Sequence, residues 1–292
     1  MALTSQDSNI DTDFLFVAQL DSVKSVLMLL KAVNFKETAL CIVTDRGLRI
    51  TVEDARSVQA SAFVQSEMFQ EYLVQDDQVI FKIHLGVLVE CLSIFGGAAT
   101  TVKMRYQGYG SPLTLLLEED GVITDCNIRT LEPDSPLEYS FQPDDVVNKV
   151  ILHSESFREV FSDLDPSSDL LEMTLTPDPG QLCFTTDGQA GETQISIPKD
   201  SELIEAFDCS VKTVSRYQFS YIKPSLKALA ISAKASVRIN EQGLLCFQYM
   251  VPTEVETCFI EYYVSVCMVH FVPYYVASMR NYNFLTRFLF QN

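Results

Sequence analysis

Basic residues are scarce in this sequence. Lys and Arg number 21 against 39 Asp and Glu, which gives a formal net charge of −18. A chain this acidic repels the phosphate backbone on average, which excludes a protein that binds DNA through a uniformly basic surface. Glycine and proline are also few, with 11 of each in 292 residues, while 47% of the residues are hydrophobic. The chain can therefore bury a core, and wholesale disorder is excluded.

Several familiar site motifs are missing. The eight cysteines include no Cys-x-x-Cys pair, so we interpret them as small buried hydrophobic residues of a reducing compartment. The three histidines lie far apart, which argues against a zinc site. No Gly-x-Ser-x-Gly, phosphate-loop or dinucleotide motif occurs, so we expect no catalytic residue, no metal and no cofactor.

Targeting signals are missing too. Residues 1–13 are polar and acidic, without the basic and apolar regions of a signal peptide, so a cytosolic or nuclear protein is expected. No run of about 20 uninterrupted apolar residues occurs, so we expect no membrane span.

The chain is predicted to be α+β, mostly strands with four short helices. The spacing of apolar residues predicts helices over 22–33, 85–95, 154–164 and 221–232. Asp21 is the expected N-cap of the first helix. Equivalent helices and strands recur at an offset of about 130 residues, which indicates an internal duplication. The predicted organisation is a flexible N-terminus (1–13), a first domain (14–130), a connector (131–145), a second domain (146–263) and an apolar tail (264–292).

Positive charge is concentrated locally. The segment 209–240 contains no acid, and Lys223 and Lys227 lie four residues apart in its helix, so they are expected to project together. Lys24 and Lys31 share a face of the first helix in the same way. These residues indicate either a helical face turned toward an anion or an ordinary solvated helix surface.

Several longer stretches carry a family resemblance. VEDARSVQASAF, CLSIFG and RYQGYG are the most specific of them, and KPSLKAL and FIEYY add to it. These stretches resemble the Rad-one subunits of the heterotrimeric checkpoint clamp, within the sliding-clamp superfamily that includes the replication clamp PCNA. The resemblance covers residues 14–263. It implies two duplicated domains with outer antiparallel sheets and four inner helices.

The resemblance also implies a function. Such a subunit assembles with two related clamp subunits into a ring, and a clamp loader places that ring around double-stranded DNA in the nucleus. The ring has no sequence specificity, and it serves checkpoint signalling and DNA repair proteins as a platform. The DNA-facing candidates are Lys24, Lys31, Arg158, Lys223 and Lys227, followed by Lys103, Arg105, Lys149 and Lys234. The candidates for an apolar pocket that binds a partner peptide beside the connector are Val52, Val58, Leu137 and Tyr139, and the alternative for each is ordinary packing.

Two other readings stay open. One is a 3′–5′ exonuclease, an activity proposed for this family, for which Glu53 and Asp163 would be test positions. The other is an interaction scaffold without a DNA role.

The tail departs from the resemblance, since residues 264–292 hold seven aromatics and two charges, Arg280 and Arg287. It is either a poorly ordered tail or a cover for a partner pocket or a subunit edge.

Overall fold

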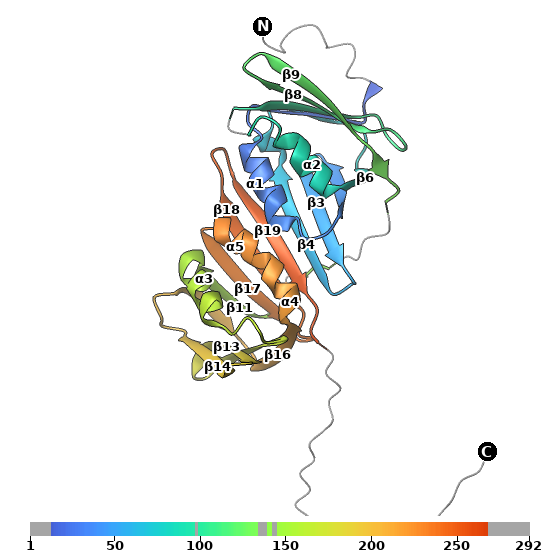
Figure 1. The fold of residues 1–292 in the computed structure, drawn as a ribbon. Helices are drawn as coiled ribbons and strands as arrows, with labels where there is room; N and C mark the ends of the chain where they lie inside the picture. The colour runs from blue at the N-terminus through green and yellow to red at the C-terminus, as the bar shows by residue number, and fades with distance from the viewer. Residues whose placement is uncertain (1–12, 97–98, 134–138, 142–144, 268–292) are drawn as a thin grey trace, which may run out of the picture.

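A computed structural model describes residues 13–96, 99–133, 139–141 and 145–267. The first half of the chain contributes a five-stranded antiparallel sheet in the order β5-β1-β7-β8-β9 (Figure 1). Its strands are β1 (Phe16–Leu20), β5 (Glu71–Val74), β7 (Thr101–Tyr106), β8 (Leu113–Glu119) and β9 (Val122–Ile128).

A ten-stranded antiparallel sheet runs through both halves in the order β10-β6-β2-β3-β4-β19-β18-β17-β11-β15. Its strands from the first half are β2 (Thr38–Thr44), β3 (Gly47–Asp54), β4 (Val58–Gln65), β6 (Val79–His84) and β10 (Thr130–Leu131). Its strands from the second half are β11 (Val146–His153), β15 (Ile204–Cys209), β17 (Lys234–Asn240), β18 (Leu245–Pro252) and β19 (Thr257–Val264). The pairing of β4 with β19 joins the two halves.

The remaining strands form a four-stranded sheet in the order β14-β13-β12-β16. They are β12 (Leu170–Pro177), β13 (Gly180–Gly188), β14 (Gly191–Pro198) and β16 (Thr213–Gln218). The strand order shows the duplication directly. The order β5-β1-β7-β8-β9 recurs as β15-β11-β17-β18-β19, and β6-β2-β3-β4 recurs as β16-β12-β13-β14. The predicted pair of duplicated α+β domains is thereby confirmed.

The helices lie together on one side of the ten-stranded sheet (Figure 1). They are α1 (Lys24–Val33), α2 (Leu85–Leu92), α3 (Ser154–Asp163), α4 (Phe219–Ile222) and α5 (Leu226–Ile231), with short 3₁₀ turns η2 (Ser66–Met68) and η3 (Lys223–Ser225). None of the helices in the described part of the chain combines the length and the hydropathy needed to cross a membrane.

Two helix predictions need correction. The helix expected over 221–232 is broken into α4, η3 and α5, because Pro224 lies inside the 3₁₀ turn η3 and lacks an amide hydrogen to donate. The N-cap of α1 is Val23 rather than Asp21, and no side chain caps it. The Lys24 amide instead donates to the Ser22 hydroxyl at 3.3 Å.

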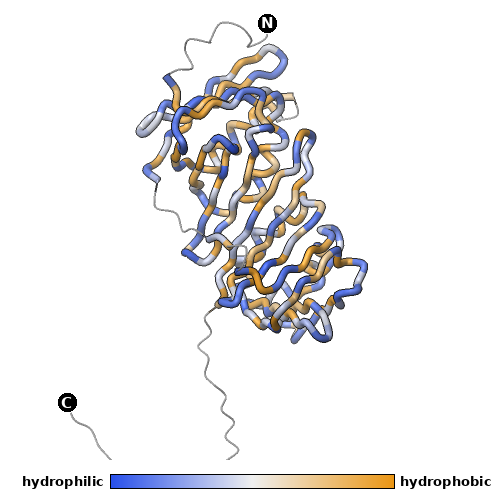
Figure 2. The backbone as a smooth tube through the Cα atoms, turned by 180° about the vertical axis from the view of Figure 1, so that it is seen from behind, coloured by the Kyte–Doolittle hydropathy of each residue, from blue (hydrophilic) through white to orange (hydrophobic). Residues whose placement is uncertain are grey.

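The core lies between the sheets and the helices. Hydrophobic and hydrophilic residues alternate along the strands, as Figure 2 shows. In β8, for example, Leu113, Leu115 and Leu117 are buried. The described chain continues past β19, where the Cys267 amide donates to the Arg216 carbonyl at 2.8 Å. The rest of the predicted tail lies outside the described residues.

Candidate functional site

The junction of the two domains holds a cleft between α1 and α5. Its volume is about 790 Å³, and Leu27 and Met28 of α1 face Ala230 and Ile231 of α5 across it. Three of the predicted DNA-facing lysines line this cleft, namely Lys24, Lys31 and Lys227. Residues almost 200 positions apart in the sequence therefore form a single basic site on the helical side of the sheet.

Hydrogen bonds fix the position of this basic group. Lys227 Nζ donates to the Asn34 carbonyl, just beyond the end of α1, at 3.0 Å. Lys24 Nζ lies 2.8 Å from the Glu254 carboxylate, and this hydrogen bond and charge raise the pKa of Lys24. Arg158 of α3 donates to the Ala230 carbonyl of α5 at 2.9 Å, which brings a fourth predicted residue to the same helix.

Lys223 does not join this cleft. Its ammonium lies 4.8 Å from the centre of the Phe219 ring and donates to the Pro166 carbonyl at 2.8 Å. The 3₁₀ turn that contains Lys223 changes the angle between successive side chains, so Lys223 and Lys227 contact different neighbours. The expectation that these two lysines project together is therefore wrong.

The four second-rank basic candidates lie on strands, and the structure does not bring them to the helices. Along β7, Val102 and Met104 belong to the hydrophobic core, so Lys103 and Arg105 point the other way. The same alternation turns Lys149 and Lys234 away from the core. Lys103 is ion-paired with Glu71 at 3.0 Å, and Lys234 is ion-paired with Glu205 at 2.7 Å.

The structure also corrects the predicted pocket for a partner peptide. Val52 and Val58 are 0% and 1% exposed and belong to the core, so a partner peptide does not reach them. They occupy the strand positions that face inward. Leu137 lies outside the described residues. Tyr139 stacks on Tyr263 with ring centres 6.1 Å apart, and its hydroxyl donates to the Arg56 carbonyl at 2.5 Å.

An open groove lies instead on the sheet face opposite the helices. Its volume is about 670 Å³. Cross-strand pairing places Ile42, Arg49, Phe63 and Phe259 in one row across β2, β3, β4 and β19, and all four line the groove. Phe63 belongs to the first domain and Phe259 to the second. The groove therefore exists only because the two domains share one sheet, and no sequence-local motif predicts it.

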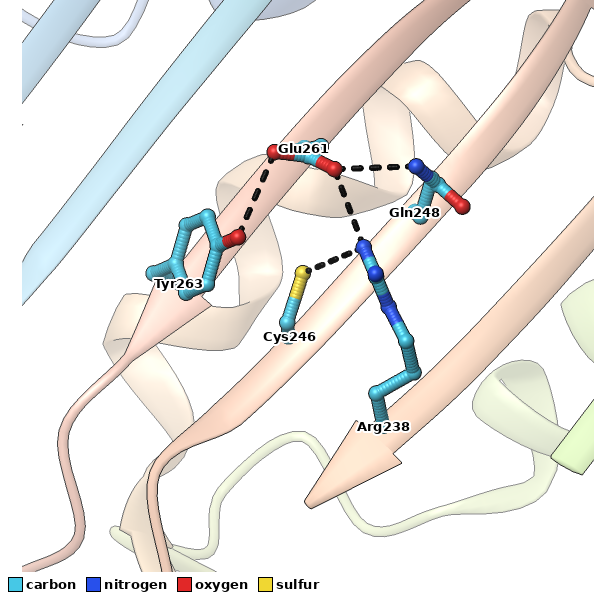
Figure 3. Close-up of polar contacts among 5 residues, drawn as sticks. All are labelled: Arg238, Cys246, Gln248, Glu261 and Tyr263. Carbon is cyan, nitrogen blue, oxygen red and sulfur yellow. Dashed lines mark hydrogen bonds and ion pairs between the residues drawn. The ribbon is translucent and has the colours of Figure 1, made fainter. Parts of the chain in front are cut away.

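A polar network borders this groove (Figure 3). Glu261 accepts from Arg238 Nη2 and from Gln248 Nε2, both at 2.9 Å, and from the Tyr263 hydroxyl at 3.3 Å. The Arg238 and Glu261 side chains are each only 18% exposed. Burial raises the pKa of the Cys246 thiol to about 12, so this thiol next to Arg238 stays protonated at neutral pH.

The network also connects to the interdomain connector. The Arg238 guanidinium lies 5.9 Å from the centre of the Phe141 ring, and Phe141 packs edge-on against Tyr263 at 5.5 Å. Burial works against the charge on Arg238, but the nearby Cys246 and Glu261 raise its pKa above the ordinary value. Since Cys246 is protonated at neutral pH, we assign this effect to the Glu261 carboxylate. The Arg238–Glu261 ion pair therefore supports the part of the connector beside the groove.

The described residues include no group of three or more His, Cys, Asp or Glu side chains arranged to hold a metal ion. The two acids considered for nuclease chemistry lie in different domains, Glu53 in β3 and Asp163 at the end of α3.

Two duplicated domains that share a continuous sheet, with all helices on one side of it, have the architecture of PCNA-like sliding clamps. Comparison with known proteins agrees with this class. A stretch of 86 residues, 30% of the chain, is 31% identical to a protein named DNA polymerase sliding clamp from Nitrosopumilus maritimus.

The family follows from longer matches. The model of the family described as repair protein Rad1/Rec1/Rad17 matches residues 15–251. The cell cycle checkpoint protein RAD1 of Homo sapiens is 47% identical over 267 residues, which cover 89% of this chain and 95% of that protein. The DNA repair protein Rad1 of Drosophila melanogaster is 32% identical over 238 residues, covering 80% of this chain and 86% of that protein. The chain belongs to the Rad1 family.

One more distant relative carries an enzyme name. The DNA repair exonuclease REC1 of Mycosarcoma maydis is 29% identical over 185 residues, which cover 53% of this chain and 40% of that protein.

Proposed function

We propose that this protein is a non-catalytic subunit of a heterotrimeric ring clamp that is loaded onto damaged DNA in the nucleus. The ring encircles the duplex without sequence specificity and serves checkpoint signalling and DNA repair proteins as a platform. The proposal is supported by the checkpoint and repair names of the relatives and by the sliding-clamp architecture.

The observation that carries ring assembly is a pair of strand edges. Within the chain, β4 of the first domain pairs with β19 of the second. The duplicated equivalents of these strands are β14 and β9, and among the described residues each of them pairs on one side only. They lie at opposite ends of the elongated molecule (Figure 1). Repeating the internal β4–β19 junction between subunits joins such ends head to tail, which generates a ring when the rotation closes.

The charge distribution supports encirclement rather than tight binding. Lys24, Lys31 and Lys227 lie on the helical side, while the chain as a whole has a net charge of −18. Flexible lysines contact phosphates without reading base edges. A closed ring stays on the duplex through its topology, so weak phosphate contacts are sufficient. The outer groove with Phe63 and Phe259 supports the platform role, because it offers a partner peptide an apolar surface for aromatic anchors.

The test is the mass in solution of this chain, alone and co-expressed with two related clamp subunits. The expected result is a one-to-one-to-one complex near three times the monomer mass of 32.9 kDa. A chain that stays monomeric is then tested without residues 268–292. If the shortened chain also fails to assemble, the clamp proposal is wrong.

The name of the Mycosarcoma relative favours exonuclease activity as a second candidate. This candidate predicts metal-dependent 3′–5′ cleavage of DNA that co-purifies with the protein. The cleavage should disappear in Glu53→Gln or Asp163→Asn. Activity that both variants retain would instead point to a contaminating nuclease.

A further inference from the structure

The two ends of the molecule differ in chemistry. At the β9 end, large apolar side chains are exposed, namely Ile94 (49%) just after α2 and Val122 (56%) and Ile123 (57%) in β9. No large exposed hydrophobic residue occurs among the described residues of α3 or β14 at the other end. There the exposed side chains include Glu155 and Glu159 of α3 and Glu192 of β14.

The internal junction between α1 and α5 shows what the β14–α3 end would look like if it bound a neighbour through apolar contacts. The buried positions Val26, Leu29, Leu30 and Val33 of α1 have the same spacing as Phe157, Val160 and Phe161 of α3 and Leu164, which follows its end. By that spacing, the residues of α1 that face α5, Leu27 and Met28, correspond to Arg158 and Glu159. Arg158 donates to the Ala230 carbonyl of α5 in its own domain, so Glu159 is the charge that remains for a neighbour. In α3, an exposed acid thus stands where the internal junction has an apolar side chain.

The arrangement of α3 places these charges at the end of the molecule. Phe157 and Phe161 pack on Phe184 of β13, with ring centres 5.7 and 5.8 Å apart. Strand β14 is the edge strand next to β13. A neighbour that adds a strand to β14 therefore also meets the exposed face of α3, as β19 and α5 meet β4 and α1 inside the chain.

A second copy of this chain is a poor neighbour for that end. Its own β9 end presents the exposed Asp125 of β9 together with the apolar Ile94 and Val122. Head-to-tail pairing of two copies would set acids against acids and apolar side chains against charged ones. Like charges across an interface suppress the wrong partner.

We propose that the β14–α3 end binds a clamp subunit whose matching edge is basic, through charge complementarity, and that it rejects a second copy of this chain. This inference rests on the proposed ring. It assigns a charge-driven interface to one end, and it leaves the apolar β9–α2 end to a neighbour with a less charged edge.

The experiment measures the two binary complexes that this chain forms with the two related clamp subunits, at low and at high salt. One complex is expected to weaken at least about tenfold as salt rises, because charge pairs at its rim are screened. The double variant Glu159→Lys/Glu192→Lys is expected to weaken that same complex by about tenfold or more and to leave the other unchanged. The matched control Glu241→Lys/Glu256→Lys makes the same change in net charge at two turns away from the interface, and it should affect neither complex.

The reciprocal variant Ile94→Ser/Ile123→Ser should weaken only the complex that is insensitive to salt. Circular dichroism and thermal melting of each variant establish that its fold is intact. Three outcomes overturn the inference: both complexes resist salt, the α3–β14 variant binds both subunits normally, or the wild-type chain self-associates through β14. If the wild-type chain binds neither subunit, the proposed ring itself fails, and that result is distinct from the other three.

Discussion

The hydroxyl of Tyr262 donates a hydrogen bond of 2.7 Å to the carbonyl of Ala32. Tyr262 lies in the last strand of the second domain and Ala32 near the end of α1 in the first. Both residues are buried, so this bond ties the domains together inside the shared core. A buried carbonyl that loses its donor keeps the desolvation cost without the compensating bond.

Tyr262→Phe is expected to lower the free energy of unfolding by about 1–2 kcal/mol. Urea denaturation measures that change, and hydrogen exchange should show the loss of protection at the end of α1. The control is Tyr217→Phe, which removes a hydrogen bond of 2.8 Å to the Gly243 carbonyl within the second domain. An equal loss of α1 protection in that control would contradict the interdomain role of Tyr262.

The lysine cleft predicts the salt dependence of DNA binding. Lys31→Gln/Lys227→Gln should weaken binding of the assembled ring to duplex DNA and reduce the slope of log affinity against log salt by about 2 at most. Fluorescence anisotropy over a salt series measures both quantities. Lys149→Gln/Lys234→Gln removes the same charge from the opposite sheet face and should leave the slope unchanged. A scaffold without a DNA role predicts no difference between the two pairs.

The mostly buried Arg238–Glu261 ion pair predicts that a single substitution of Glu261 lowers the stability of the fold. Glu261→Gln should destabilise the protein by about 1–3 kcal/mol, because it takes the charged hydrogen-bond acceptor from a mostly buried guanidinium. Chemical denaturation measures this loss. Glu172→Gln is the matched control, since its partner Arg216 is 55% exposed, and we expect less than about 1 kcal/mol there. Equal losses in the two variants would show that burial of the pair is unimportant.

The hydrogen bonds of Asp165 predict that the stability of the β13–β14 hairpin depends on pH. Its carboxylate accepts from Ser167 and from the Ala190 amide at the hairpin turn, and these hydrogen bonds lower its pKa from 3.8. A lowered folded-state pKa adds stability that is complete above 3.8 and disappears as pH falls through the folded pKa. Exchange of the Ala190 amide, corrected for intrinsic rates, should therefore accelerate at acidic pH in the wild type. Asp165→Asn should exchange faster already at neutral pH, and it should lose most of the additional dependence on pH.

Much of the secondary structure could be predicted from local patterns. The helix ending at Val33 is predictable because the spacing of its apolar residues acts over a few positions. Strands β5 and β15 carry no comparable local signal, since sequences such as Glu71–Val74 are short edge strands whose pairing partners lie far away. The break at Pro224 was assigned to a continuous helix, although the proline itself was the available signal.

The candidate site residues also divide into those that local sequence patterns identify correctly and those that they do not. Lys24, Lys31 and Lys227 could be selected from helical spacing and local charge, and the structure brings them together. Lys103 and Arg105 are candidates because they are basic and share one face of a strand. The alternation of Val102, Met104 and Tyr106 around them already indicated that they face away from the core.

The sequence by itself determined the α+β class, the duplication, the acidic balance and the family resemblance, because composition and short-range periodicity are properties of the linear chain. Only the tertiary structure decided that β4 pairs with β19 and that Phe63 and Phe259 therefore line one groove. It also decided that Glu261 neutralises Arg238 beneath the connector. Both relationships depend on which strands meet. For β4 and β19 that choice depends on burial of apolar faces between residues almost 200 positions apart, which no local pattern encodes.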